Sequence, residues 1–144
     1  MTTVASDGCV MAADTMLTYG NTERINVGNP KIFKFKGCLY GFSGRDDMVQ
    51  QAHEWIISGA DPKKRPKLEE DSVWILKVDV KGKCWAAYET LVFVPRPLPS
   101  AIGAGAVVAE TAMYLGKSVK EAVQVAIDLT VGSGGPIQVL ALHT

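Results

Sequence analysis

Histidine and cysteine are both scarce in this sequence of 144 residues. The only histidines are His53 and His143, so we expect no chemistry that needs several imidazoles. The three cysteines show no C-x-x-C spacing. Their odd number argues against a disulfide framework or a structural zinc site and fits a reducing cytosol. We therefore expect a cytoplasmic protein that binds no metal and no cofactor.

An excess of charge is also missing, because 15 basic and 15 acidic side chains leave a net charge of zero. A nucleic-acid-binding protein normally carries a basic excess that neutralises phosphates. No apolar run approaches the ~20 residues of a membrane span. The first residues, MTTVASDG, lack the basic and apolar regions of a signal peptide. We therefore expect neither nucleic acid nor a membrane as a partner.

What the sequence does contain is a series of short strand-like stretches joined by X-Gly pairs. These pairs are Asp7-Gly8, Lys36-Gly37 and Lys81-Gly82. Glycine accepts the positive φ that tight turns require, so each pair between apolar runs predicts a hairpin. The N-terminal half is therefore predicted to be antiparallel sheet.

Three helices are predicted, the first and third from the spacing of their apolar residues. The first is RDDMVQQAHEWII, with Ser43 as its expected N-cap. The second runs from about Ala104 to Leu115. The third begins with the capping box Ser118-Val119-Lys120-Glu121 and has one apolar stripe. A last strand is predicted in IQVLALH.

Two stretches are predicted to be irregular connections. Residues 61–71 are charged and broken by proline, and residues 94–100 contain three prolines, which remove donors from a central strand. The length and the 47% apolar content fit one core, so we expect a single domain over residues 1–144. Because strands and helices come in separate groups, the fold class is predicted to be α+β.

The start of the chain offers a nucleophile. If Met1 is removed, Thr2 carries a hydroxyl beside a free α-amino group, whose pKa of roughly 7.7–8.0 lets it accept a proton near neutral pH. Thr2 and Asp14 are each six residues from Gly8, so a hairpin that turns there places them opposite one another. The pair is thus a candidate site.

Several segments, in this order, resemble proteasome β-type subunits and the bacterial HslV peptidase. The similar segments are TTVA with VMAADTMLTYGN, NPKIFKF, GFSGRDD, AIGAGAVVAETAMYLG, KSVKEAVQVAIDL and SGGPIQVL. The resemblance implies an N-terminal-nucleophile (Ntn) hydrolase fold, a four-layer αββα sandwich of two antiparallel sheets flanked by helices. This would be a short version of that fold.

The resemblance also implies roles for individual residues. Thr2 matches the nucleophile that attacks a peptide or amide carbonyl. Lys31 matches the active-site lysine whose charge favours the reactive form of Thr2, and Asp14 matches the carboxylate that orients this lysine. The Gly41 N–H would act as oxyanion donor, a contribution worth ~10²–10³ in rate.

The support expected from the C-terminal half is less complete. Ala104 stands where the resembling proteins usually carry a serine that assists the nucleophile. Ser133 matches a second serine that helps to hold the terminal amine. The accompanying aspartate position falls on Thr130, with Asp128 two residues earlier, and either residue could take that role.

The function predicted is therefore that of a threonine-type peptidase that hydrolyses peptide bonds with Thr2. The resemblance implies a homo-oligomeric ring, a peptide or unfolded-protein substrate and an ATP-driven unfoldase as partner. Two alternatives stay open. One is an inactive proteasome-like scaffold or assembly protein, which Ala104 favours, and the other is an Ntn amidase that acts on a small molecule.

Overall fold

The computed structural model describes residues 2–19, 23–26, 31–130 and 133–143. Met1 lies outside the described residues. The strands are β1 (Thr3–Ser6), β2 (Val10–Ala13), β3 (Met16–Tyr19), β4 (Glu23–Asn26), β5 (Ile32–Phe35), β6 (Cys38–Gly44), β7 (Val73–Val78), β8 (Cys84–Ala87), β9 (Val94–Pro95), β10 (Ser100–Gly103) and β11 (Gln138–Ala141). The helices are α1 (Asp46–Ile57), α2 (Ala106–Tyr114) and α3 (Val119–Leu129), with a short 3₁₀ turn at Pro62–Lys64.

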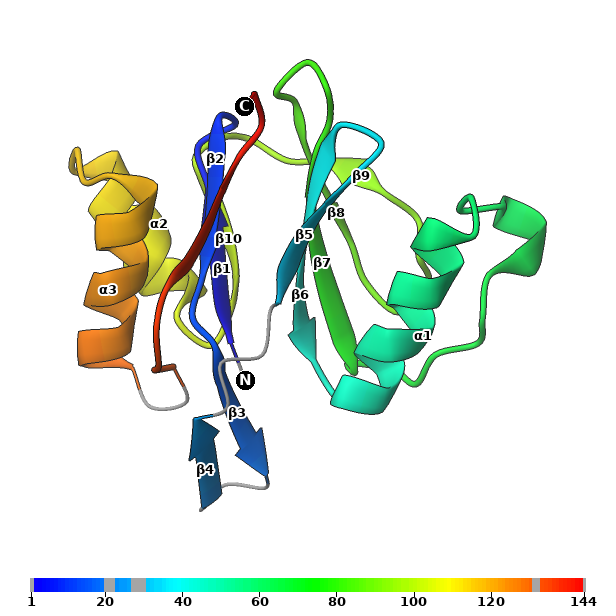
Figure 1. Ribbon diagram of the computed structural model, residues 1–144, viewed down its shortest axis with the longest axis horizontal. Coiled ribbons are helices and arrows are strands. Elements are labelled where there is room, and N and C mark those ends of the chain that lie inside the picture. Colours follow the sequence, from blue (N-terminus) through cyan, green and yellow to red (C-terminus); the bar gives the residue numbers. More distant parts are fainter. Residues whose placement is uncertain (1, 20–22, 27–30, 131–132, 144) are drawn as a thin grey trace.

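Two antiparallel sheets form the centre of the molecule (Figure 1). One has the strand order β10-β1-β2-β11 and the other β5-β6-β7-β8-β9, while β3 and β4 form a separate hairpin. The three predicted hairpins correspond to β1–β2, β5–β6 and β7–β8. Gly8, Gly37 and Gly82 all have positive φ, which explains why glycine stands at each of these turns.

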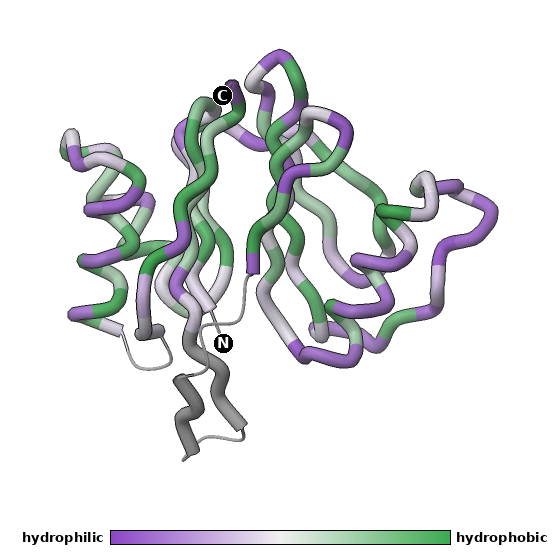
Figure 2. The backbone as a smooth tube through the Cα atoms, viewed as in Figure 1, coloured by the Kyte–Doolittle hydropathy of each residue, from purple (hydrophilic) through white to green (hydrophobic). Residues whose placement is uncertain are grey.

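The two sheets face each other across a buried apolar layer. Val4 and Met11 from the first sheet pack here with Leu39 and Leu76 from the second. Successive side chains of a strand point to opposite faces, so the neighbours of these residues point outward to the helices. Figure 2 shows the apolar colouring concentrated along both sheets and the polar colouring on the outer loops.

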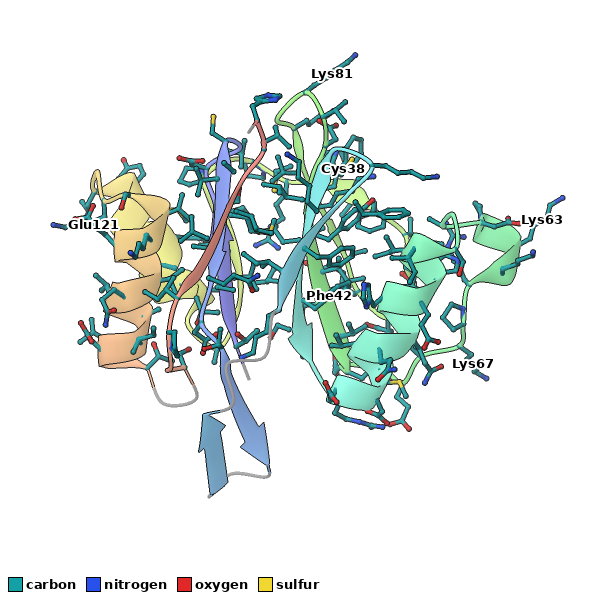
Figure 3. All side chains as sticks on the ribbon, in the orientation of Figure 1. Cys38, Phe42, Lys63, Lys67, Lys81 and Glu121 are labelled. Atoms are coloured by element: carbon teal, nitrogen blue, oxygen red, sulfur yellow. The ribbon has the colours of Figure 1, made fainter. Side chains whose placement is uncertain are left out.

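Helices cover the outer face of each sheet (Figure 1). Helices α2 and α3 pack on the first sheet against Ala5 and Ala12, and α1 packs on the second against Tyr40 and Phe42. Figure 3 shows Phe42 between β6 and α1. The order of layers is helix, sheet, sheet, helix, so the α+β sandwich expected from the sequence is confirmed.

The helix ends confirm one predicted cap and correct another. Ser118 and Glu121 form the expected capping box, in which each side chain accepts from the backbone N–H of the other residue. Ser43 does not cap α1, because β6 continues through Gly44 and the N-cap residue is Arg45. The hydroxyl of Ser43 is directed instead at the start of the chain.

The proline-rich connection contains only the two-residue edge strand β9, as expected from the missing ladder donors. The charged connection after α1 extends outward, and Figure 3 shows Lys63 and Lys67 pointing away from the body of the molecule. None of the helices in the described ranges is long and apolar enough to cross a membrane.

Candidate active site

The hairpin of β1 and β2 brings the start of the chain to Asp14. Its register pairs Val4 with Ala13, so continuing the ladder by one residue places Thr3 opposite Asp14. The backbone agrees, since the Asp14 N–H donates to the Thr3 carbonyl oxygen at 3.2 Å. The prediction that Thr2 lies directly opposite Asp14 is therefore wrong by one residue. Thr2 reaches the carboxylate with its side chain instead.

Asp14 is completely buried and accepts hydrogen bonds from several directions. The Thr2 hydroxyl and the Thr3 N–H, at 3.0 Å, both donate to Oδ1. The Gly134 N–H donates to Oδ2 at 2.8 Å. A buried carboxylate is costly unless such donors replace water, so these contacts explain how Asp14 can stay inside the fold.

Lys31 lies next to the same carboxylate oxygen. Its Nζ is 3.4 Å from Asp14 Oδ1, and its side chain is only 10% exposed. Burial lowers the pKa of Lys31 below its ordinary value, and the charge of Asp14 and the hydrogen bond to it offset part of this shift. Lys31 therefore gives up its proton more readily than an exposed lysine does.

The carbonyl oxygen of Thr2 is held by two further segments. The Ala104 N–H donates to it at 3.0 Å and the Ser43 hydroxyl at 3.4 Å. Close approach is possible because residue 103 is glycine: a Cβ there would lie 1.6 Å from the Thr2 oxygen. The turn before α2 therefore fixes the backbone of Thr2 although Ala104 has no hydroxyl.

The fold that brings Thr2, Asp14 and Lys31 together also occurs in solved structures of other proteins. Eukaryotic HslV from Trypanosoma brucei superposes with a TM-score of 0.69 at 15% identity, over 98% of this chain and 99% of that one. BPH from Thiobacillus denitrificans in complex with epoxomicin superposes with a TM-score of 0.67 at 17% identity, over 99% of both chains. The chain has the fold of HslV and BPH.

A second structure of Thiobacillus denitrificans BPH superposes with a TM-score of 0.65 at 16% identity, over 98% of this chain and 97% of that one. No family model and no curated sequence matches the chain. The likeness to HslV that the sequence predicted is thus confirmed for the fold, over almost the whole chain. At 15–17% identity it does not assign chemistry to any residue.

Ser133 lies close to the start of the chain, and its described hydrogen-bond partner is Thr3. The two side-chain oxygens are 2.8 Å apart, and both residues are buried. Asp128, in contrast, is on the exposed face of α3 and accepts from the amide of Gln124. The described contacts of Thr130 include a backbone bond that closes the end of α3. The structure therefore brings Ser133 to the site through Thr3 and places Asp128 on the surface.

Gly41 occupies an interior position of β6 rather than a strand end. The Phe42 N–H donates to the Lys31 carbonyl on the β5 side. Because successive N–H groups of a strand point to opposite neighbours, the Gly41 N–H points toward β7 and its partner Leu76. A Cβ at Gly41 would lie 2.4 Å from Val4 Cγ1. Gly41 therefore serves the packing between the sheets, and its N–H does not face the same side as that of Phe42.

Three contacts of the site were not predicted from the sequence. They come from Thr3, Ser43 and Gly134. The sequence signal for Thr3 is the second threonine of the Thr-Thr pair, and the signal for Gly134 is the Gly-Ser-Gly-Gly run that contains Ser133. In the described part of the chain, no group of three or more histidine, cysteine or acidic residues could hold a metal ion.

Proposed function

We propose that this chain is a threonine-type peptidase that hydrolyses peptide bonds with Thr2 after removal of Met1. One observation carries the proposal: the buried Thr2 hydroxyl donates to Asp14, whose same oxygen lies 3.4 Å from Lys31 Nζ. A hydroxyl, a carboxylate and a lysine of lowered pKa in one buried place form an arrangement that can activate a nucleophile.

In the proposed reaction, the Thr2 oxygen attacks the carbonyl carbon of the substrate. The hydroxyl proton moves to the α-amino group that removal of Met1 exposes. The peptide C–N bond then breaks, the leaving amine takes up this proton, and an ester joins the acyl group to Thr2. Water then attacks the ester carbonyl while the α-amino group accepts a proton from it. The C–O bond to Thr2 breaks, this proton returns to the Thr2 oxygen, and the carboxylic acid leaves. Asp14 orients the hydroxyl, and Lys31 supplies positive charge beside it.

The oxyanion of the tetrahedral intermediate needs a backbone N–H that is not used in the sheet. We place this donor at Gly44 rather than at Gly41. The N–H of Gly44 points to the same side of β6 as that of Phe42, and within the described residues the β5–β6 ladder ends at the pair of Ile32 with Gly41. Ser43, the neighbour of Gly44, already contacts the Thr2 carbonyl.

Labelling with epoxomicin, the compound bound in the structure of BPH, tests the proposal. The wild-type chain, Thr2→Ala and Thr2→Ser are incubated with the compound, and intact mass spectrometry reads both loss of methionine and addition of one adduct. We expect the adduct on the wild type and on Thr2→Ser, which keeps a hydroxyl, and none on Thr2→Ala. A wild-type chain that retains Met1 and takes no adduct rules out the peptidase.

Ala104 favours a second candidate, an inactive scaffold, because the turn before α2 lacks a hydroxyl. That reading requires an unlabelled wild-type chain that still assembles. Labelling of Thr2 without hydrolysis of peptides, but with hydrolysis of small amides, would instead identify an Ntn amidase. Fluorogenic peptides and simple amides offered to the same preparation separate these outcomes.

We further propose that copies of the chain assemble into a ring that receives unfolded protein from an ATP-driven unfoldase. The support is a set of large apolar residues that the single chain leaves between 73% and 84% exposed, namely Val107, Tyr114, Leu115 and Leu129 on α2, α3 and their ends. Exposed apolar patches of this kind mark interaction surfaces. Light scattering should give a mass of several times 15.5 kDa, and Tyr114→Glu should reduce it. A monomer would contradict the ring.

A further inference from the structure

Thr3 is a fully buried polar residue beside the nucleophile, and the peptidase mechanism does not use its side chain. Its Oγ1 accepts from the Gly105 N–H at 3.0 Å and is 2.8 Å from the hydroxyl oxygen of Ser133. Its N–H donates to Asp14 Oδ1, and its carbonyl oxygen accepts from the Asp14 N–H. Every polar atom of Thr3 is therefore engaged.

These contacts join three segments that are far apart in the sequence. Thr3 belongs to β1, Gly105 is the N-cap residue of α2, and Ser133 precedes the loop glycine whose N–H holds Asp14 Oδ2. The approach is close, since a Cβ on Gly105 would lie only 2.4 Å from Thr3 Oγ1. The Thr3 hydroxyl is therefore the point at which the strand, the helix start and the loop meet.

The hydroxyl matters here more than the shape of the side chain. Valine has the shape of threonine but cannot accept from the Gly105 N–H, and a buried N–H without an acceptor is costly. Valine would also remove the described hydrogen-bond partner of the Ser133 hydroxyl. The loop of Ser133 and Gly134 would then lose its tie to β1, although Gly134 still has to reach Asp14.

We propose that Thr3 is a positioning residue for the reaction of Thr2, an inference that rests on the proposed peptidase function. Its hydroxyl fixes the loop of Ser133 and Gly134 so that the Gly134 N–H stays on Asp14 Oδ2. Asp14 is thereby held in the orientation in which Oδ1 accepts from the Thr2 hydroxyl. At a turn where Ala104 supplies no hydroxyl, the strand supplies one from the opposite side.

A matched pair of variants in the full-length chain tests this inference. Thr3→Val keeps the shape and removes the hydroxyl, whereas Thr3→Ser keeps the hydroxyl and removes a methyl group. We expect Thr3→Val to lower kcat for a fluorogenic peptide, and the rate of epoxomicin labelling, by about 10- to 100-fold with little change in KM. Thr3→Ser should stay within about 3-fold of wild type, since only the methyl contact is lost. A residue needed only for packing would give the reverse order.

A second readout keeps the inference separate from the peptidase itself. Amide hydrogen exchange at Gly105 and Gly134 should become faster in Thr3→Val and stay near the wild-type rate in Thr3→Ser. If wild type is not labelled by epoxomicin, the proposed function fails, and unchanged exchange in Thr3→Val would refute the positioning role on its own. If wild type is labelled but Thr3→Val reacts at the same rate, only the positioning role fails. Should Thr3→Val not fold, Ser133→Ala removes the other end of the same hydrogen bond: exchange must then become faster at Gly134 but not at Gly105, whose N–H keeps Thr3 Oγ1 as acceptor.

Discussion

The two helical layers of the molecule bury side chains of very different size. Between α2–α3 and the first sheet, seven of the ten buried apolar residues are alanine: Ala5, Ala12, Ala101, Ala109, Ala112, Ala122 and Ala126. Between α1 and the second sheet, the buried residues include Tyr40, Phe42 and Trp55, and Phe33 stacks on both Tyr40 and Phe42. The alanine layer packs against Gly105, the residue whose N–H donates to Thr3, since a Cβ there would lie 2.7 Å from the Ala126 Cβ.

The difference indicates what each layer does. Small side chains let backbones approach closely, and the site is built largely from backbone groups at close approach: the Ala104, Gly105 and Gly134 N–H groups. The aromatic layer buries a large apolar area, and its described contact with the site is the Phe42 N–H that donates to the Lys31 carbonyl. Added volume should therefore damage the first layer, and lost volume should damage the second.

The largest effect is expected for Gly103→Ala. The new methyl group would overlap the Thr2 carbonyl oxygen, and φ at this position is +95°. We expect a loss of more than about 4 kcal/mol of folding free energy and no labelling of Thr2. Gly116→Ala is the matched control, because φ there is +99° with nothing within 4 Å, so only backbone strain of about 1–3 kcal/mol is added. Thermal unfolding of both variants measures the difference, and equal losses would contradict the close approach.

Truncation of the aromatic layer is expected to cost stability and spare the chemistry. Trp55 is buried, and its Nε1 donates to the Asp61 carbonyl at 2.9 Å. Trp55→Ala should lower the free energy of unfolding by about 3–5 kcal/mol through the cavity that it leaves. Urea unfolding measures this loss, and the labelling rate of Thr2 per folded molecule should not change. A fall in that rate would show that α1 also supports the site.

Added volume in the alanine layer is expected to impair the site as well as the stability of the fold. The Ala126 Cβ lies 2.7 Å from the place that a Cβ on Gly105 would occupy, so α3 is in close contact with the start of α2. Ala126→Leu should cost about 1–3 kcal/mol of folding free energy and also slow the labelling of Thr2, because Gly105 is pushed away from Thr3. Titration of folded protein with epoxomicin separates the two losses. An unchanged labelling rate would place Ala126 outside the support of the site.

The smallest effect is a change in how stability depends on pH. The folded pKa of Lys31 is below that of the unfolded chain, so between these two values the unfolded state binds more protons. The contribution of Lys31 to the free energy of unfolding therefore rises with pH between the folded and the unfolded pKa. It is lowest below the folded pKa. Urea unfolding from pH 7 to pH 10 should show that the free energy of unfolding of the wild type increases relative to that of Lys31→Met as pH rises. Burial raises the pKa of Cys84 to about 11 and that of Tyr40 to about 12, but both chains carry these groups, so the difference isolates Lys31. A flat difference would contradict the lowered pKa.

The sequence predicts the parts of the structure that depend on local signals. The X-Gly turns, the capping box of α3 and the apolar stripes of the helices are read from residues a few positions apart, and the structure has all of them. The hairpin register was wrong by one residue because the symmetry about Gly8 ignores the actual turn, which is centred between Gly8 and Cys9. Register is a property of the turn geometry, not of residue count alone.

The site was predictable only in part. Thr2, Asp14 and Lys31 follow from the resemblance, and they meet in the structure. Ser43 was assigned as a cap because its contact with Thr2 spans 41 positions of the chain and leaves no local pattern. The contact between Thr3 and Ser133 spans 130 positions for the same reason. Asp128 shows the converse: it is near Ser133 in the sequence, but its side chain lies on the exposed face of α3 and accepts from Gln124.

The alanine layer has a consequence for the entropy of the site. Burying a leucine or methionine side chain removes rotamer freedom, whereas alanine has no rotamers to lose. Of the buried residues in this layer only Met113, Val119 and Val123 have rotamers to lose, so α2 and α3 are ordered on the first sheet at a low side-chain entropy cost. Every copy of the chain is therefore expected to hold Thr2 and Thr3 in the same arrangement before any ligand arrives.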